Sequence, residues 1–172
     1  MVSLFFICGC SIKYQDIAPE KNSPRVQLLE KEILSLSKNI DKIEAEDLAI
    51  FSISYSKKLA NDYHITLSPL FQNFLINIGL RKKGYCYNYA NDLLKALLKR
   101  GYESFDFYRV IYKKGTMFEH NAILIRAKNS KVSGVILDGW RNAGKLYFSK
   151  IENDKEYKWK IFYKAYPKFC NR

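Results

Sequence analysis

The sequence predicts an α+β domain in which helices from the first part of the chain pack on an antiparallel sheet formed by the second part. Before Gly101, apolar residues recur at the spacing of amphipathic helices. From residue 105 onward the pattern changes to short β-branched and aromatic runs, separated by polar or glycine-containing turns. Helices first and strands second indicate the α+β class, because a parallel sheet would require the two to alternate.

Two amphipathic helices are expected near the start of the domain. The first covers residues 25–40 and follows Ser23-Pro24, a pair that suits a helix start. The second covers residues 44–63 and begins with acidic residues, which interact favourably with a helix N-terminus. The serines in its middle weaken the helical pattern without breaking it.

Two further helices are expected before the strands. The first covers residues 68–79, opens with Ser68-Pro69 and ends on a glycine; because it is strongly apolar, we expect it to be buried. The second covers residues 86–101 and also ends on a glycine. One face of this last helix carries four leucines, Leu93, Leu94, Leu97 and Leu98.

The strand-forming runs cover residues 105–113, 120–127, 132–140, 145–151 and 157–164. Each run is short, and short polar loops connect consecutive runs. Short strands with short connections are typical of antiparallel neighbours. We therefore expect a meander in which each strand pairs with the next one along the chain.

The N-terminus, MVSLFFICGC, is uncharged and apolar, and Ile7-Cys8-Gly9-Cys10 resembles a bacterial lipobox. The resemblance implies a signal remnant over residues 1–9, lipidation of Cys10, a tether over residues 10–24 and a domain over residues 25–172. It also implies a bacterial cell-envelope location, anchored to the inner or outer membrane with the domain in the periplasm or at the cell surface. The departure is the missing basic segment before the apolar run. The alternative is a buried N-terminal strand with two incidental cysteines; a spanning helix is excluded, because crossing a bilayer takes about 20 apolar residues.

The composition gives bounds on partners. With 172 residues, 48% of them hydrophobic, the chain suits one domain with a real core, and we expect a monomer. Its net charge of +12, interleaved with many tyrosines and phenylalanines, could indicate nucleic-acid binding. A lipidated envelope protein would rarely meet nucleic acid, so we expect none. The charge then indicates a solvated lysine-rich surface that leans on anionic lipid or cell-wall polymer. Two distant histidines and few thiols predict no metal site, and the absence of a glycine-rich phosphate loop predicts no nucleotide cofactor.

Three residues combine in a pattern that points to nucleophilic catalysis. Cys86 opens the leucine-bearing helix, His120 follows 34 residues later at the start of a strand, and Asp138 follows 18 residues after that at the end of the next. A helix N-terminus and a nearby imidazolium favour the thiolate, and a carboxylate holds the imidazole in one tautomer. We expect the Cys86 sulfur within about 4 Å of one His120 ring nitrogen and Asp138 within about 2.6–3.2 Å of the other. Trp140 would shield this pair from water or simply pack in the core.

The segments GYCYNYANDLLKALLKRG, FEHNAILI and GVILDGW together resemble the transglutaminase-like branch of the papain-like cysteine-enzyme superfamily. The resemblance covers about a third of the chain, from Gly84 to Trp140. It implies a central helix packed on an antiparallel sheet, and amide cleavage or acyl transfer through a thioester on Cys86. His120 would be the general base and Asp138 its orienting group. The implied substrate is a peptide or a cell-wall crosspeptide, and hydrolysis and transfer both remain open.

The donors that would stabilise an oxyanion are the least defined part of this hypothesis. The backbone N–H of Cys86 is one candidate. Papain-type members place a glutamine a few residues before the cysteine, whereas residues 78–85 contain none. Tyr85 and Asn88 could donate instead, and Gln72 lies 14 residues earlier on another helix.

Several alternatives remain open at this point. Cys86 could form a disulfide with Cys170, which would leave a non-catalytic envelope protein that binds a peptide or protein partner with the same fold. Glu119 is the rival acid, but neighbouring residues on a strand point to opposite faces, so we expect it to look away from the site. His64 is expected on the surface at a helix end, without a catalytic role.

Overall fold

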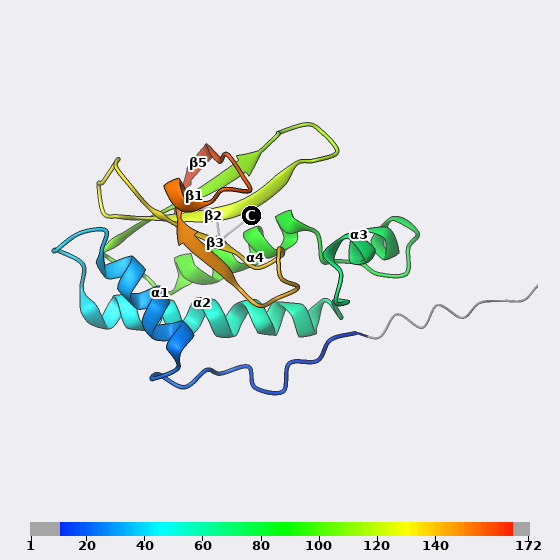
Figure 1. Cartoon of the computed structure of the whole chain (residues 1–172), viewed down its shortest axis with the longest axis horizontal. Coiled ribbons are helices and arrows are strands. Elements are labelled where there is room, and N and C mark those ends of the chain that lie inside the picture. The colour runs from blue at the N-terminus through cyan, green and yellow to red at the C-terminus, as the bar shows by residue number, and fades with distance from the viewer. Residues whose placement is uncertain (1–10, 167–172) are drawn as a thin grey trace, which may run out of the picture.

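Helices cover one face of a five-stranded antiparallel sheet in the computed structural model, which describes residues 11–166 (Figure 1). The four α-helices of this part of the chain precede the strands, so the predicted α+β class is confirmed.

The first two helices are α1 (Pro24–Leu34) and α2 (Lys42–Asp62), which pack against each other. The predicted first helix is too long by about one and a half turns. It ends early because the Ser35 hydroxyl donates to the Glu32 carbonyl at 2.7 Å, an alternative to continued helix that serine offers the backbone. Asp41 then caps α2 by accepting from the amides of Ile43 and Glu44.

Helix α3 (Pro69–Asn77) has nearly the predicted bounds, but the prediction that it is buried is wrong. Only Gln72 and Leu75 of this helix are buried, whereas Leu70 and Phe74 are 72% and 48% exposed. The helix is apolar on all sides, and only one side meets the rest of the described chain. Periodicity could not reveal this, because apolar residues on every face give no indication of which face has a partner.

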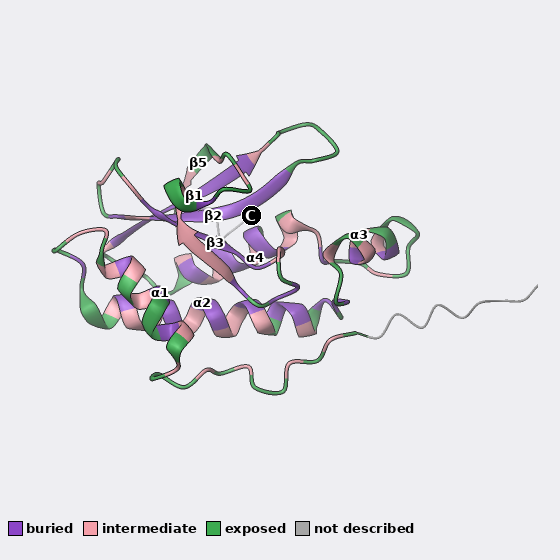
Figure 2. Cartoon of the chain, in the orientation of Figure 1, coloured by how far each residue is buried: buried purple, intermediate pink, exposed green. Residues whose placement is uncertain are grey.

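Helix α4 (Cys86–Lys99) is the central helix and lies between α2 and the sheet. Its packed face is formed by Tyr89, Ala90, Leu93, Leu94 and Leu97, all of them buried (Figure 2). This packing fixes the helix, and with it the position of Cys86 at its N-terminus.

The sheet has the strand order β4-β3-β2-β1-β5, and all paired neighbours are antiparallel. The first four strands form the expected meander. The fifth does not pair with β4 but crosses to the opposite edge, beside β1, which corrects the expectation that each strand pairs with the next. The strands are β1 (Phe105–Tyr112), β2 (His120–Ala127), β3 (Val135–Asp138), β4 (Tyr147–Lys150) and β5 (Lys160–Ala165).

The crossing segment, residues 151–159, begins with a short 3₁₀ turn and helps to cover the sheet face opposite α4. On that face Leu124 and Ile136 pack beneath Ile151 and Trp159, while Ile123 and its alternate neighbours belong to the core that contains α4. Both faces of β2 are therefore buried, which explains why this strand reads as a continuous apolar run instead of an alternating one.

The segment predicted to be a tether contacts the domain from its first described residue onward. Ser11 forms a β-bridge with Thr66, and the Ile12 amide donates to the Ile65 carbonyl at 2.7 Å. Further along, Tyr14 reaches across the molecule and donates its hydroxyl to the Ala143 carbonyl at 3.0 Å. Cys10 and its predicted lipidation lie outside the described residues. Within residues 11–166, no helix has the length and apolar character needed to cross a bilayer.

Candidate functional site

A cleft of about 270 Å³ lies where α4, β2 and the turn after β3 meet, and Cys86, His120 and Trp140 line it. Leu70 of α3 and Phe118 of the β1–β2 loop border the same cleft. Asp138, the last residue of β3, lies directly behind His120. The fold thus assembles at one end of the sheet three residues that are far apart in sequence.

The loop before Cys86 is held rigidly. The Asn88 side-chain oxygen accepts from the amides of Gly84 and Tyr85 at 3.1 and 3.0 Å, which fixes the start of α4. Gly84 has φ +131°, and a Cβ there would lie only 2.7 Å from Cγ of Gln72, so any side chain at this position would be strained and would displace Gln72. Gln72 is buried and donates to the Lys83 carbonyl at 3.0 Å. These contacts deliver Cys86 to the helix N-terminus in one position.

Cys86 is a half-buried free thiol with polar neighbours on several sides. Its sulfur lies 3.9 Å from the Glu119 carbonyl oxygen and accepts from Nδ2 of Asn121 at 3.8 Å. Cys86 and His120 line the same cleft, and a hydrogen bond to the Cys86 side chain is one cause of the raised pKa of His120. The distance of about 4 Å expected between the sulfur and a His120 ring nitrogen stays a prediction. The thiol thus has one acceptor, the Glu119 carbonyl, and one donor, the Asn121 amide, beside it.

His120 and Asp138 form a buried pair, with 2.6 Å between Nε2 of the imidazole and Oδ2 of the carboxylate. This distance lies within the predicted range. Burial alone would lower the pKa of His120, but the hydrogen bonds to Asp138 and Cys86 more than offset it and raise the pKa to about 9. At neutral pH the ring is therefore an imidazolium between a thiol and a carboxylate.

The Asp138 carboxylate has a full set of partners. Its Oδ1 accepts from the amides of Trp140 and Arg141 at 3.0 and 3.2 Å, and its Oδ2 accepts from Nε of Arg141 at 3.1 Å. Burial alone would raise the pKa of Asp138, but the hydrogen bond from His120 and the Arg141 charge hold it below its ordinary value. Arg141 is itself paired with Asp154 at 2.7 Å, so the crossing segment 151–159 is tied to the triad.

Aromatic rings enclose the imidazole. The ring centroids of Trp140, Tyr157 and Trp159 lie 4.9, 4.5 and 5.4 Å from that of His120. This packing excludes water from the His120–Asp138 hydrogen bond, and aromatic faces favour a cation between them. Trp140 therefore lies where the sequence placed it, and the two rings of the crossing segment were not anticipated.

A second polar network lies on the other side of Cys86. Asn121 accepts at its side-chain oxygen from Nε of Arg109 at 3.3 Å, and Arg109 also donates to the Asn91 side chain at 2.7 Å. Asn121, Arg109 and Asn91 were not predicted from the sequence. Two signals could have found them: an arginine inside an apolar strand, and an asparagine adjacent to His120 that must face the opposite side, toward α4.

The side chains predicted to stabilise an oxyanion are engaged elsewhere. The Tyr85 hydroxyl donates to the Asn77 side chain. The Asn88 oxygen caps α4, and both ends of the Gln72 amide bond to backbone groups. The backbone N–H of Cys86 remains a candidate, because the first amides of a helix have no intrahelical acceptor. The Asn121 amide, which also donates to the Glu119 carboxylate at 3.0 Å, reaches the sulfur and is a further side-chain candidate.

The remaining candidates have separate outcomes. Glu119 does line the cleft, but its carboxylate accepts from the Gly115 amide and from Asn121, and these hydrogen bonds lower its pKa; Asp138 is the acid that bonds His120. His64 is exposed at the end of α2, as expected. Cys170 lies outside the described residues. Among residues 11–166, no three or more acidic, histidine or cysteine side chains cluster as metal ligands would.

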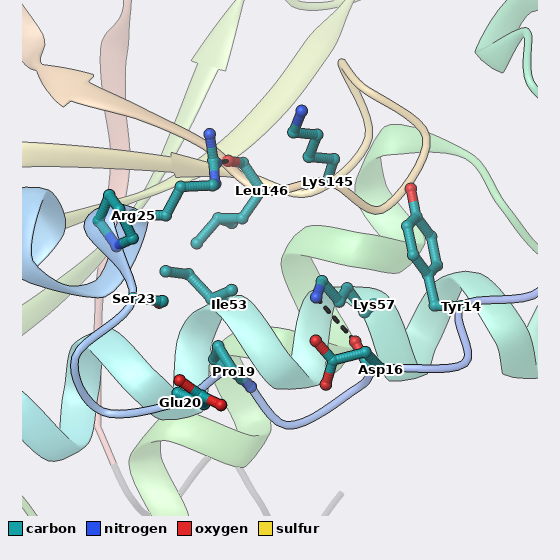
Figure 3. Close-up of a pocket in the computed structure, with 11 residues that line it drawn as sticks. Tyr14, Asp16, Pro19, Glu20, Ser23, Arg25, Ile53, Lys57, Lys145 and Leu146 are labelled. Atoms are coloured by element: carbon teal, nitrogen blue, oxygen red, sulfur yellow. Dashed lines mark hydrogen bonds between the residues drawn. The ribbon is translucent and has the colours of Figure 1, made fainter.

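A larger cavity, of about 650 Å³, lies away from these groups (Figure 3). It lies between the N-terminal segment and α2, where Lys57 donates to the Asp16 carbonyl at 2.7 Å. Tyr14, Pro19, Ile53 and Leu146 also line it, and none of the Cys86, His120 or Asp138 side chains does. The smaller cleft, which Cys86 and His120 line, is therefore the candidate functional site.

Comparisons with protein-family models, with curated proteins and with solved structures find no match to this chain.

Proposed function

We propose that this protein is a membrane-anchored thiol enzyme that cleaves or transfers amide bonds through a Cys86–His120–Asp138 triad and an acyl-thioester. The observation that carries the proposal is the buried His120–Asp138 pair, at 2.6 Å, whose imidazole lines the same cleft as a free thiol at a helix N-terminus. The three motif segments that resemble transglutaminase-like enzymes agree with it, and so does the packing of α4 on an antiparallel sheet.

The first half-reaction forms the thioester. The Cys86 thiolate attacks the substrate carbonyl, and the negative charge moves to the carbonyl oxygen. The Cys86 amide and Nδ2 of Asn121 are the donors placed to bind that oxygen. As the C–N bond breaks, His120 gives its proton to the departing amine, while Asp138 keeps the ring in the tautomer that can do so.

The second half-reaction releases the acyl group. His120, now neutral, removes a proton from water or from an acceptor amine as that molecule attacks the thioester. The thiolate leaves and the imidazolium re-forms. Water gives hydrolysis and an amine gives transfer. The proposed substrate is a peptide or a cell-wall crosspeptide, and lipidation of Cys10 would hold the domain in the cell envelope.

Thiol reactivity tests the proposal directly. We expect iodoacetamide to alkylate native Cys86 at pH 6 about tenfold faster than Cys86 in the urea-unfolded chain, because only the folded protein stabilises the thiolate. Mass spectrometry of the Cys86 peptide reports the rate site by site. The His120→Gln variant should lose the acceleration. Alkylation that is slower in the native protein at every pH would refute the triad.

A second function is favoured by one observation, the engagement of Tyr85, Asn88 and Gln72 in structural hydrogen bonds. A site that lacks oxyanion donors would bind a peptide or protein partner without turning it over. The two functions separate when the protein is incubated with muropeptide amides. An enzyme forms a Cys86 thioester, visible by intact mass, that Cys86→Ser abolishes; a binding module forms none.

A further inference from the structure

Several large apolar side chains on and around α3 are exposed to solvent. Leu67, Leu70 and Leu80 are 83%, 72% and 61% exposed, and Phe74 and Ile78 are about half exposed. Leu70, Phe74 and Ile78 are spaced four residues apart, so they form one stripe along the helix. We call these five residues the α3 surface. A contiguous apolar patch of this kind marks an interaction site in a folded protein.

A second apolar projection borders the same cleft. Met117 and Phe118, in the β1–β2 loop, are 90% and 63% exposed, and both line the cleft together with Leu70. Exposed apolar residues elsewhere, such as Ile43 and Val132, lie outside this cleft lining. The α3 surface and the Met117–Phe118 tip therefore lie on either side of the opening that leads to Cys86.

This end carries more basic than acidic residues, although Glu119 and Glu156 line the cleft and Lys83 pairs with Asp92 at 2.9 Å. The chain has no acidic residue between Asp62 and Asp92, and Arg81, Lys82 and Lys83 follow directly after the α3 surface. Two more lysines precede the Met117–Phe118 tip in the β1–β2 loop. Apolar side chains ringed by lysine and arginine are the combination that binds at the interface of an anionic bilayer.

The path of the N-terminal segment points to the same end. Ser11 pairs with Thr66, the residue before Leu67, and Arg81 donates to the Ser11 hydroxyl at 3.3 Å. Ser11, the first described residue, therefore lies beside the α3 surface.

We infer that the α3 surface and the Met117–Phe118 tip insert into the interface of an anionic lipid bilayer. A hydrophilic anionic polymer would satisfy the basic residues but leave the apolar ones in water. A symmetric second copy would bury the apolar stripe, but residues 63–91, which would form its side of the contact, offer no acidic group to the basic residues. An anionic bilayer would bury the apolar side chains and also pair with the basic residues.

This placement has a consequence for the substrate, which rests on the proposed function. The cleft would open onto the lipid surface, so the amide that reaches Cys86 would belong to a membrane-borne molecule. The surface itself does not depend on thiol chemistry, and its test is separate from the alkylation test.

The test uses full-length Cys10→Ala protein, which cannot be lipidated, and flotation with vesicles of phosphatidylglycerol and phosphatidylcholine. We expect the Leu67→Ser/Phe74→Ser double variant to lose at least about tenfold in vesicle affinity, because two apolar side chains no longer enter the interface. Lys82→Gln should lose about fivefold on these vesicles and nothing on phosphatidylcholine alone. None of the three positions, Leu67, Phe74 and Lys82, lines the cleft.

The matched control is Ile43→Ser/Val132→Ser, which removes two exposed apolar side chains from other parts of the surface and should bind as the parent does. Thermal unfolding checks that each variant is folded. Equal binding of the parent and the Leu67→Ser/Phe74→Ser variant would overturn the inference. So would a dimer in sedimentation analysis that this variant abolishes, because the stripe would then be covered by a second copy.

Discussion

The two walls of the cleft differ in how completely their polar groups are paired. On one wall the His120 and Asp138 side chains are 4% and 1% exposed, and Arg141 and three aromatic rings lock the pair in place. On the other wall Cys86 is half-buried, and the nearby Met117 and Phe118 are open to solvent. The polar groups of the His120–Asp138 wall are therefore fully paired without a substrate. The wall that would hold the substrate still has side chains open to solvent.

The difference shows that the His120–Asp138 wall is the more rigid of the two. A general acid must keep one tautomer and one orientation, and here a buried carboxylate with four hydrogen bonds enforces both. The open wall can accept substrates of different shape. Substitutions on the two walls should therefore have effects of different kinds.

The largest effect is expected from Asp138→Asn. The amide cannot hold His120 in the required tautomer, so turnover should fall by up to about 10⁴-fold, by analogy with the serine triad. Because Asp138 is fully buried beside Arg141, the variant should also lose about 3 kcal/mol of unfolding free energy, measured by urea denaturation.

Glu119→Gln is its matched control, since Glu119 borders the same cleft without bonding His120. It should keep turnover within about tenfold. An equal loss in both variants would mean that the two walls do not divide the chemistry as described.

The next effect is expected from Asn121→Ala on the open wall. Removing one oxyanion donor typically costs about 10²- to 10³-fold in the catalytic rate constant. The measurement is kcat at saturating substrate, alongside the melting temperature. Asn91→Ala is the comparison, because it removes the other amide that binds Arg109 but has no contact with the sulfur. If both variants lost the same activity, Asn121 would act only through Arg109.

The pH dependence of turnover and of stability tests the wall that contains His120 and Asp138. In the proposed mechanism the imidazolium protonates the leaving amine, so turnover should fall about tenfold per pH unit above the His120 pKa of about 9. The raised pKa also stabilises the fold: its contribution is fully present below pH 6.5, the ordinary value, and is lost as the pH rises through 9. Urea denaturation of the wild type and His120→Gln across this range should show a slope that the variant lacks.

The smallest effect is expected from Gly84→Ala, which tests how the thiol is delivered. A side chain at φ +131° is strained, and its Cβ would lie 2.7 Å from Gln72. We expect a loss of about 1–3 kcal/mol in unfolding free energy. Gly101→Ala, also at positive φ but with open space around it, is the control for strain without collision. A native-like stability for Gly84→Ala would show that the loop before Cys86 adapts.

The sequence predicted some parts of this fold closely. Strand β2 has the predicted bounds, His120 to Ala127, because both its faces are buried and its ends are marked by polar residues. Helix α4 also begins where predicted, at Cys86, since its apolar face and the preceding glycine loop are local signals. The distance between His120 and Asp138 followed from placing them at the ends of adjacent strands, while their catalytic role stays a prediction.

Other parts depend on long-range contacts that local patterns do not encode. The pairing of β5 with β1 could not be read from short loops, because the connection crosses a whole sheet face. The exposure of α3 depends on what lies beside it. Asn121 reaches the thiol only because β2 meets the start of α4, so its role appears once the tertiary structure is known.

The crossing segment 151–159 gives the molecule an order of assembly. It is synthesised after Cys86, His120 and Asp138, yet it supplies Asp154, which binds Arg141, and two of the three rings around the imidazole. A nascent chain that ends before this segment contains the thiol but lacks the surroundings that hold the imidazolium. The surroundings of the imidazolium are therefore complete only once residues 151–159 have crossed the sheet.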